Sequence, residues 1–270
     1  MSYPGGKNGA GVYQKIINLM PPHESYYEPF LGGGAVLLHK RPAGRNVGID
    51  VNAQAIANFS AGIAMPNKPD PVTKFLAIAA ATHRQISPSR NAPARNVICP
   101  DPPSTIARPG EPGRPLELIC ADALHFLQNH TFQTHDLIYC DPPYLHATRH
   151  STHIYRHEMT DQQHEQLLAI LITLPCMVMI SGYWSEPYAH QLTAWHATTY
   201  QAMTRGGTSR QEWLWCNFPP PHKLHDYTYT GANFRQRERI KRKINRWVER
   251  LARLPETERR AILAQLPTPD

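Results

Sequence analysis

The sequence predicts an α/β protein built on a doubly wound, mostly parallel sheet. Short apolar runs rich in β-formers alternate with helical patterns, 41% of the residues are hydrophobic and only 18% are charged. Such alternation is typical of a parallel sheet covered by helices, and this apolar content suffices for a core and argues against disorder. The strand candidates are residues 25–28, 46–51, 116–121, 136–140, 177–181 and 212–218.

The helical patterns cover residues 33–40, 52–63 and 161–174. In the last of these, Leu167, Leu168, Leu171 and Ile172 lie on one helix face, as in a helix that packs on a sheet. Ligands of doubly wound sheets bind beyond the carboxyl ends of the strands. The residues that follow each predicted strand are therefore the first candidates for a functional site.

The length of 270 residues suits one large domain with a small appendage. We expect a main domain over residues 1–230 and an extension over 231–270. No apolar run reaches the roughly 18–20 residues that span a bilayer, and the N-terminus lacks the layout of a signal peptide. Five Cys without a C-x-x-C pair argue against a zinc ribbon or a secreted disulfide scaffold. We therefore expect a cytoplasmic protein without a membrane partner.

The basic charge of the chain is concentrated near its C-terminus. Residues 235–260 contain eleven Arg or Lys and four Glu, an excess of seven that equals the net charge of the whole chain. Ile240, Ile244, Trp247 and Leu251 recur among them at helical spacing, which predicts one basic amphipathic helix over this segment. A localised basic excess is typical of a polyphosphate partner. A helix that only aids solubility is the alternative.

A proline-rich segment interrupts the alternation of strands and helices. Eight Pro fall between residues 87 and 115, within a longer insert over residues 64–115. Proline at this density is incompatible with helix interiors and central strands. The segment is therefore predicted to be an irregular excursion from the sheet.

The tetrapeptide Asp141-Pro142-Pro143-Tyr144 directly follows the strand predicted over 136–140. It suits the methylation of an exocyclic amine, whose delocalised lone pair attacks poorly until acceptors hold its hydrogens. The Asp141 carboxylate and the Pro142 carbonyl can supply two acceptors in fixed geometry, because prolines stiffen the loop and carry no N–H. Tyr144 offers a π-face on which a base can stack. A strand-ending turn without function is the alternative.

Acidic residues and a glycine loop follow three other predicted strands. The segment E-P-F-L-G-G-G at 28–34 permits a tight strand-to-helix turn close to a ligand. Asp50 lies 18 residues beyond Gly32, where an acid can bind a ribose diol, and Asp122 follows its strand in the same way. A dinucleotide-binding loop is the alternative, although Leu37 stands where its third glycine would be.

Four histidines follow the tetrapeptide at helical-looking intervals: His146, His150, His153 and His157. No neighbouring Cys or carboxylate-rich element completes a zinc site, so we expect no metal. A loop that closes over a flipped base and contacts phosphates through His and Arg is one interpretation, and a polar surface loop is another.

In chain order, Y-P-G-G-K (3–7), E-P-F-L-G-G-G (28–34), G-I-D (48–50), A-D (121–122) and D-P-P-Y (141–144) resemble the motifs of Dam-like N6-adenine DNA methyltransferases. The later Y-R-H-E-M-T (155–160), S-G-Y (181–183) and E-W-L-W (212–215) are similar to compact phage-type members. The resemblance spans residues 3 to about 218 and implies a class I methyltransferase fold that uses S-adenosylmethionine. The sequence departs from the family at Tyr3, where Trp is more familiar. Only residues 64–115 are left as a candidate target-recognition region.

The resemblance also implies roles for individual residues. Tyr3 and Lys7 would line the methionine part of the cofactor, Asp50 would hold its ribose and Asp122 would lie near its adenine, while Asp141 would touch both cofactor and target amine. The implied cofactor residues are Tyr3, Gly6, Lys7, Glu28, Phe30, Gly32, Gly34, Asp50, Asp122 and Asp141. The implied catalytic residues are Asp141, Pro142, Pro143 and Tyr144.

We therefore expect an adenine-specific, site-specific DNA methyltransferase (EC 2.1.1.72), of restriction-modification or orphan type, that flips its target out of double-stranded DNA. Alternatives within the class are cytosine-N4 and RNA-adenine methyltransferases, which more often carry Ser or Asn in place of Asp141. A catalytically inactive DNA-binding protein on the same fold is the alternative from another class, and the oligomeric state stays open. The expected DNA contacts are Arg149, Arg156, Arg235, Arg239, Lys241, Arg242 and Lys243.

Overall fold

The computed structural model describes residues 7–9, 11–63, 105–107, 115–145, 148, 158–203 and 208–265. The chain divides into two compact units. The first comprises residues 1–66 and 99–227, and the second comprises residues 67–98 and 228–270.

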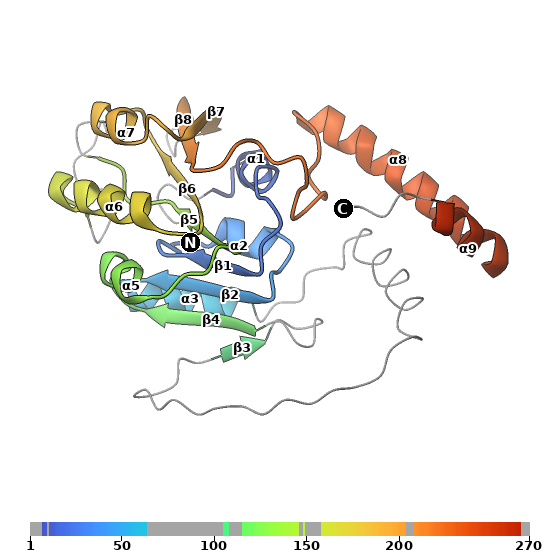
Figure 1. Cartoon of the computed structure of the whole chain (residues 1–270), viewed down its shortest axis with the longest axis horizontal. Helices are drawn as coiled ribbons and strands as arrows, with labels where there is room; N and C mark the ends of the chain where they lie inside the picture. The colour runs from blue at the N-terminus through green and yellow to red at the C-terminus, as the bar shows by residue number, and fades with distance from the viewer. Residues whose placement is uncertain are drawn as a thin grey trace. The chain divides into compact units, whose positions relative to one another are not determined.

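Within the described residues of the first unit, eight strands form one sheet in the order β3-β4-β2-β1-β5-β6-β8-β7 (Figure 1). The strands β4, β2, β1, β5 and β6 are parallel, whereas β3 runs antiparallel to β4 and β8 runs antiparallel to both β6 and β7. The predicted fold class, an α/β protein with a doubly wound, mostly parallel sheet, is therefore confirmed. The strands are β1 (Ser25–Glu28), β2 (Arg45–Asp50), β3 (Thr105–Ala107), β4 (Pro115–Cys120), β5 (Asp136–Cys140), β6 (Met177–Gly182), β7 (His196–Met203) and β8 (Ser209–Cys216).

Two of these strands were not among the predicted ones. β7 is the last strand of the sheet, and most of its residues are exposed or half-buried. Its sequence H-A-T-T-Y-Q-A-M therefore lacks the apolar run by which the other strands were found. β3 has three residues and lies at the opposite edge of the sheet, inside the insert predicted to be irregular.

Some helices of the first unit begin at side-chain caps. Thr160 and Gln163 form a capping box at the start of α6, and the Asp122 carboxylate accepts a hydrogen bond from the His125 N–H at the start of α5. The helix predicted from residue 33 begins only at Ala35, because Gly34 adopts a left-handed conformation before it. The helices are α1 (Val12–Ile17), α2 (Ala35–His39), α3 (Ala53–Ile63), α5 (Ala123–Asn129), α6 (Asp161–Thr173) and α7 (Glu186–Gln191).

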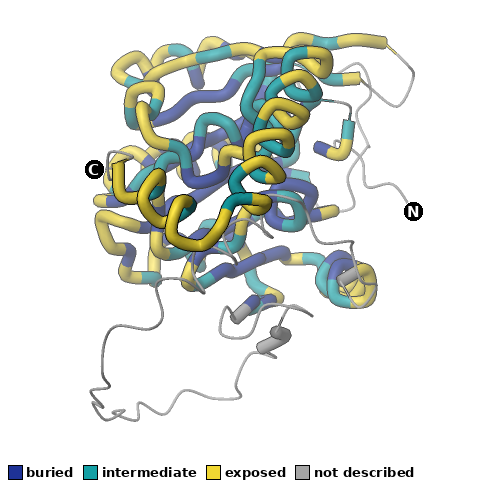
Figure 2. The backbone as a smooth tube through the Cα atoms, turned by 90° about the vertical axis from the view of Figure 1, so that its right-hand side faces the viewer, coloured by how far each residue is buried: buried dark blue, intermediate teal, exposed yellow. Residues whose placement is uncertain are grey.

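The core of this unit is formed by the middle of the sheet and the helices that pack on it. All five residues of β5 are buried, and in Figure 2 such buried stretches run between half-buried and exposed ones. Leu167, Leu168 and Leu171 of α6 join Ile138 and Val178 in one hydrophobic cluster. This packing holds the carboxyl ends of β1 and β5 in fixed positions, which matters for the site described below.

The second unit contains two helices, α8 (Phe234–Ala252) and α9 (Glu256–Gln265). The prediction of one continuous helix over 235–260 is thus wrong: α8 ends at Ala252, three residues before Pro255. Proline disfavours helical geometry in the residue before it and cannot donate the backbone hydrogen bond that would continue the helix.

No residue of α8 or α9 is buried. Ile240, Ile244 and Leu251 are half-buried, whereas Trp247 is 51% exposed. Among the described helices, none is both long and apolar enough to cross a membrane.

Candidate active site

The candidate site lies where the strand order of the sheet reverses, between β1 and β5. Glu28 is the last residue of β1, Asp50 is the last residue of β2, and Asp141 directly follows β5. Because parallel strands bring their carboxyl ends to one edge, these three acids from distant parts of the sequence face the same region.

A cavity of about 710 Å³ lies at this edge. Its walls come from the glycine loop, from the ends of β2 and β5, from α3 and from the start of α5. It gathers all the predicted cofactor residues that the structure describes: Lys7, Glu28, Phe30, Gly32, Gly34, Asp50, Asp122 and Asp141. Tyr3 and Gly6 lie outside the described residues.

The glycine loop owes its path to its sequence. Gly34 has a φ of 56°, and a Cβ added there would lie 2.1 Å from the Phe59 ring, so only glycine fits. The Asp50 carboxylate accepts hydrogen bonds from the backbone N–H groups of Gly32 and Asn52, both at 2.8 Å. Asp50 therefore fixes the loop against the end of β2 while it lines the cavity.

This cavity suits a nucleoside with a charged tail. Asp50 is held rigidly, and each of its carboxylate oxygens keeps a second lone pair that a ribose hydroxyl can use. Phe30, Val51 and Leu124 offer apolar surface beside it, where a purine ring can pack. At the other end, Lys7 and Asp141 line the wall with charge, next to Pro142 and Pro143.

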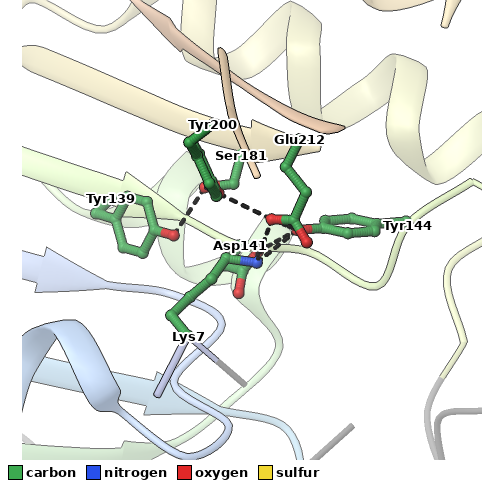
Figure 3. A network of polar contacts seen from close by, with 7 residues as sticks. All are labelled: Lys7, Tyr139, Asp141, Tyr144, Ser181, Tyr200 and Glu212. Carbon is green, nitrogen blue, oxygen red and sulfur yellow. Dashed lines mark hydrogen bonds and ion pairs between the residues drawn. The ribbon is translucent and has the colours of Figure 1, made fainter. Parts of the chain in front are cut away.

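A buried cluster of charged and phenolic side chains adjoins the cavity (Figure 3). The Lys7 ammonium lies 2.8 Å from Asp141 Oδ1 and 3.1 Å from Glu212 Oε2, and it also donates to the Tyr144 hydroxyl. Tyr144 and Tyr200 each donate to Glu212 Oε2 at 2.8 Å. Because all of these side chains are largely removed from water, their charges interact strongly.

The surroundings shift the pKa values of the acids in this region. Burial raises the pKa of Asp141 to about 6; Lys7 opposes this shift and Glu212 adds to it. Burial raises the pKa of Glu28 to about 8, although hydrogen bonds from Tyr26 and the Leu37 N–H act against it. Burial by itself lowers the pKa of Lys7, but its acidic neighbours raise it well above the usual value, so it stays charged. Asp141 is therefore ionised at neutral pH and more basic than an ordinary carboxylate.

Tyr144 points its hydroxyl into this cluster and is only 5% exposed. Its hydroxyl lies 2.8 Å from Glu212 and 3.2 Å from Asp141, and its ring meets Tyr183 edge-on with centroids 4.6 Å apart. The polar contacts fix the ring, whereas the stacking of a base on it stays a prediction.

Sequence reasoning missed two members of the cluster, Glu212 and Tyr200. Tyr200 lies on β7, the strand that was not predicted, and Glu212 was placed in a predicted strand without a role of its own. A signal existed, since a glutamate directly before Trp213-Leu214-Trp215 in a strand is poorly suited to burial without a partner.

A second cavity, also of about 710 Å³, is lined by residues of the loop after Tyr144, of α6 and α7, and of β8. Trp184 is 55% exposed beside it, and the Arg210 guanidinium lies over the Tyr183 ring at 5.1 Å. The buried Ser185 hydroxyl in its wall has no hydrogen-bond partner among the described residues. Through Tyr183, this cavity adjoins Tyr144.

The predicted DNA-contacting residues fall into two groups. Arg149 and Arg156 lie outside the described residues, as do the four histidines between 146 and 157. No group of three or more potential metal ligands occurs in the part of the chain that the structure describes. The remaining predicted contacts are exposed on α8: Arg235, Arg239, Lys241, Arg242 and Lys243.

Comparison with known proteins gives one family match. Residues 115–181, which include β4, β5 and the tetrapeptide, match the family model of the D12 class N6 adenine-specific DNA methyltransferases. The resemblance found in the motifs is thus confirmed over this stretch, and it supports assignment of the chain as a methyltransferase. The search of curated proteins found no match.

Several solved structures are similar to the chain. A conserved hypothetical protein from Streptococcus pyogenes is 15% identical, with 80% of this chain and 99% of that chain covered and a TM-score of 0.39. The N-methyltransferase NodS from Bradyrhizobium japonicum is 12% identical, with 77% and 94% covered and a TM-score of 0.41. A SAM-dependent methyltransferase from Agrobacterium tumefaciens is 13% identical, with 76% and 60% covered and a TM-score of 0.39.

Proposed function

We propose that the protein transfers a methyl group from S-adenosylmethionine to the exocyclic N6 amine of adenine in double-stranded DNA, the activity of EC 2.1.1.72. The observation that carries the proposal is the Asp141 carboxylate, which lines the cavity at the carboxyl ends of β1, β2 and β5, beside Pro142, and is held by Lys7. The family match over residues 115–181 supports adenine in DNA as the target.

The residues that would hold the cofactor are those of the cavity. Asp50 would accept hydrogen bonds from the ribose hydroxyls, the glycine loop would let the backbone approach, and Phe30 and Leu124 would flank the adenine. When bound, S-adenosylmethionine supplies an electrophilic methyl group on a sulfonium.

The chain's own contribution is to activate and align the amine. Asp141 would accept one amine hydrogen and the Pro142 carbonyl the other, which raises the electron density on the nitrogen and directs its lone pair into the cavity. Asp141 would hold the amine nitrogen toward the methyl group that the cofactor would supply, and it would take up the amine proton that methylation releases. Holding the amine and the methyl group in line accounts for much of the acceleration in a reaction of this kind.

The target base must reach Asp141 from outside the duplex, because its amine is inaccessible within the stack. Tyr144 would flank the flipped base, and the second cavity, with Tyr183, Trp184 and Arg210, offers stacking faces and a cation beside it. The exposed basic residues of α8 would contact phosphates and supply sequence-independent affinity.

Transfer of labelled methyl groups in vitro tests the proposal. The protein is incubated with S-adenosylmethionine labelled in its methyl group and with duplex DNA or RNA, and the products are digested to nucleosides. We expect label in N6-methyldeoxyadenosine from duplex DNA. Label in N4-methyldeoxycytidine or in RNA adenosine would favour the alternative substrates, and no label would favour the inactive DNA-binding protein.

A further inference from the structure

Glu212 is a second buried carboxylate beside Asp141, and the proposed reaction gives it no part. It lies on β8, is 5% exposed, and receives three donors on one oxygen: the Lys7 ammonium and the Tyr144 and Tyr200 hydroxyls. A buried carboxylate is costly unless it is compensated. Glu212 is well compensated, but it competes with Asp141 for two of the same donors.

The distances indicate how the hydrogens are divided. Tyr144 has one hydroxyl hydrogen, and its oxygen lies 2.8 Å from Glu212 Oε2 but 3.2 Å from Asp141 Oδ1, so the hydrogen goes to Glu212. The Lys7 ammonium contacts Asp141, Glu212 and Tyr144 at once, so Asp141 shares this donor with both. Asp141 Oδ1 is therefore left with Lys7 as its principal donor.

The other oxygen of Asp141 is available to a substrate. Among the described residues, none donates a hydrogen bond to Asp141 Oδ2. The Asp141 side chain is 17% exposed, and the residue lines the cavity. The carboxylate thus faces the buried cluster with one oxygen and can accept an amine hydrogen with the other.

The electrostatic surroundings of Asp141 come from several elements. The charged or acidic side chains that act on it are Lys7, Glu28 on β1 and Glu212 on β8. Phenols and a thiol also interact electrostatically with Asp141, from β1, from β5 and the loop after it, from α7 and from β7: Tyr26, Tyr139, Cys140, Tyr144, Tyr188 and Tyr200. Of these, Lys7 and, to a smaller extent, the Tyr144 hydroxyl favour the ionised carboxylate, and Glu212 opposes them.

We propose that Glu212 is a positioning residue that draws Lys7 and the Tyr144 hydroxyl partly away from Asp141, so that Asp141 stays basic enough to accept a hydrogen of the substrate amine. Without Glu212, both donors would turn to Asp141, and its carboxylate would become a weaker acceptor. The inference rests on the proposed function, because it assigns Asp141 to the amine.

The proton balance of the transfer follows from this arrangement. When the amine nitrogen forms its bond to the methyl carbon and the carbon–sulfur bond breaks, the nitrogen gains a positive charge. The N–H electron pair then stays with the nitrogen, and the proton passes to Asp141 Oδ2. Asp141 later releases this proton to water, which restores the ionised carboxylate. A more basic Asp141 assists the proton transfer, in keeping with Brønsted behaviour.

Three variants separate this role from a structural one. Glu212→Gln removes the negative charge but keeps a carbonyl oxygen that the same three donors can reach. Tyr200→Phe removes one donor from Glu212, which then attracts Lys7 and Tyr144 more strongly. Glu117→Gln is the matched control, because Glu117 is also an ion-paired glutamate on a strand, but it pairs with Arg45 outside the cluster.

The first readout is the titration of the Asp141 carboxyl, followed by NMR in protein labelled with ¹³C in its aspartate carboxyls and without cofactor. The Asp141 signal is identified by its loss in Asp141→Asn. We expect the pKa of Asp141, about 6 in the wild type, to fall in Glu212→Gln, to rise in Tyr200→Phe and to stay unchanged in Glu117→Gln. Shifts in opposite directions would not result from a general loss of packing.

The second readout is the pH dependence of kcat for methyl transfer to duplex DNA. The acid limb should move to lower pH in Glu212→Gln and to higher pH in Tyr200→Phe. In Glu212→Gln, kcat at neutral pH should fall by up to about 100-fold, the lower end of what general acid–base catalysis contributes, with little change in KM for DNA.

An Asp141 pKa that is the same in folded Glu212→Gln and in the wild type would overturn the inference. If Glu212→Gln does not fold, the direction of the shift in Tyr200→Phe decides, and no rise there would overturn it. If the wild type transfers no methyl group, the proposed function fails, while the NMR titration still tests the charge relation between Glu212 and Asp141.

Discussion

Charged side chains are concentrated at two places in this molecule, and they are buried at one and exposed at the other. In the first unit, Lys7, Asp141 and Glu212 form a cluster whose side chains are at most 17% exposed and whose polar atoms contact one another. In the second unit, α8 carries a dense run of Arg and Lys without one buried residue. The buried cluster holds three charges in fixed geometry, whereas the helix presents many charges to solvent.

The difference indicates what each region can do. In a low-dielectric environment a neighbouring charge changes the protonation of a group, and burial together with Lys7 and Glu212 sets the pKa of Asp141 at about 6. On an exposed helix, water and salt screen such effects within about 8–10 Å, so the charges act mainly through counterion release. Changes in the cluster should therefore alter catalysis, and changes in the helix should alter affinity and its salt dependence.

The largest effect is expected at Asp141. Asp141→Ala removes the carboxylate that is proposed to accept the amine hydrogen, so turnover should fall by at least about 100-fold, as is usual when a fixed electrostatic contact is lost. DNA binding, measured by fluorescence anisotropy, should stay close to that of the wild type. Turnover above about a tenth of the wild-type value would exclude the proposed role.

Asp50→Ala should mainly weaken the binding of cofactor. Asp50 holds the glycine loop and is placed to bind the ribose, and a hydrogen bond to a charged group contributes roughly 1.5–3 kcal/mol. Titration calorimetry with S-adenosylmethionine should therefore show a dissociation constant at least about tenfold higher. An unchanged affinity would mean that Asp50, at the end of β2, anchors the glycine loop but does not contact the cofactor.

Neutralising Arg239, Lys241, Arg242 and Lys243 should weaken binding to all duplexes alike, because phosphate contacts carry no sequence information. Each phosphate contact that is lost should also reduce the slope of log affinity against log salt by about 0.9. The measurement is a titration from about 50 to 200 mM salt with target and scrambled duplexes. A helix that only aids solubility would leave both the affinity and the slope unchanged.

The smallest effect is expected at an exposed ion pair in the second unit. Glu256 and Arg260 lie 2.6 Å apart on α9, but their side chains are 62% and 56% exposed. Arg260→Gln should therefore change the free energy of unfolding by no more than about 0.5 kcal/mol in urea denaturation. This small change should vanish in high salt, and a loss of several kcal/mol would contradict the contrast between buried and exposed charge.

The parts of the fold that follow from local pattern could be predicted from the sequence. β1 and β5 have the predicted bounds, because each is a short run of β-forming residues that ends at an acid followed by a proline. β7 escaped prediction because an edge strand with alternating polar residues shows no apolar run. The break at Pro255 is visible in the sequence, but the apolar spacing around it favoured one continuous helix.

The site could be predicted only in part. The residues at the strand ends were found because parallel topology brings carboxyl ends together, and all those that the structure describes line one cavity. The cluster was not found, because Lys7, Asp141 and Glu212 are far apart in the sequence and meet through tertiary packing. No local pattern shows that a glutamate on β8 lies close to Asp141.

Methylation of genomic DNA in living cells tests the account most directly. The wild-type chain and Asp141→Ala are expressed in a bacterial host that lacks adenine methylation, and the DNA is digested to nucleosides for mass spectrometry. The account predicts N6-methyldeoxyadenosine with the wild type and none above background with Asp141→Ala. N4-methyldeoxycytidine in its place, or equal N6-methyldeoxyadenosine with both chains, would contradict it.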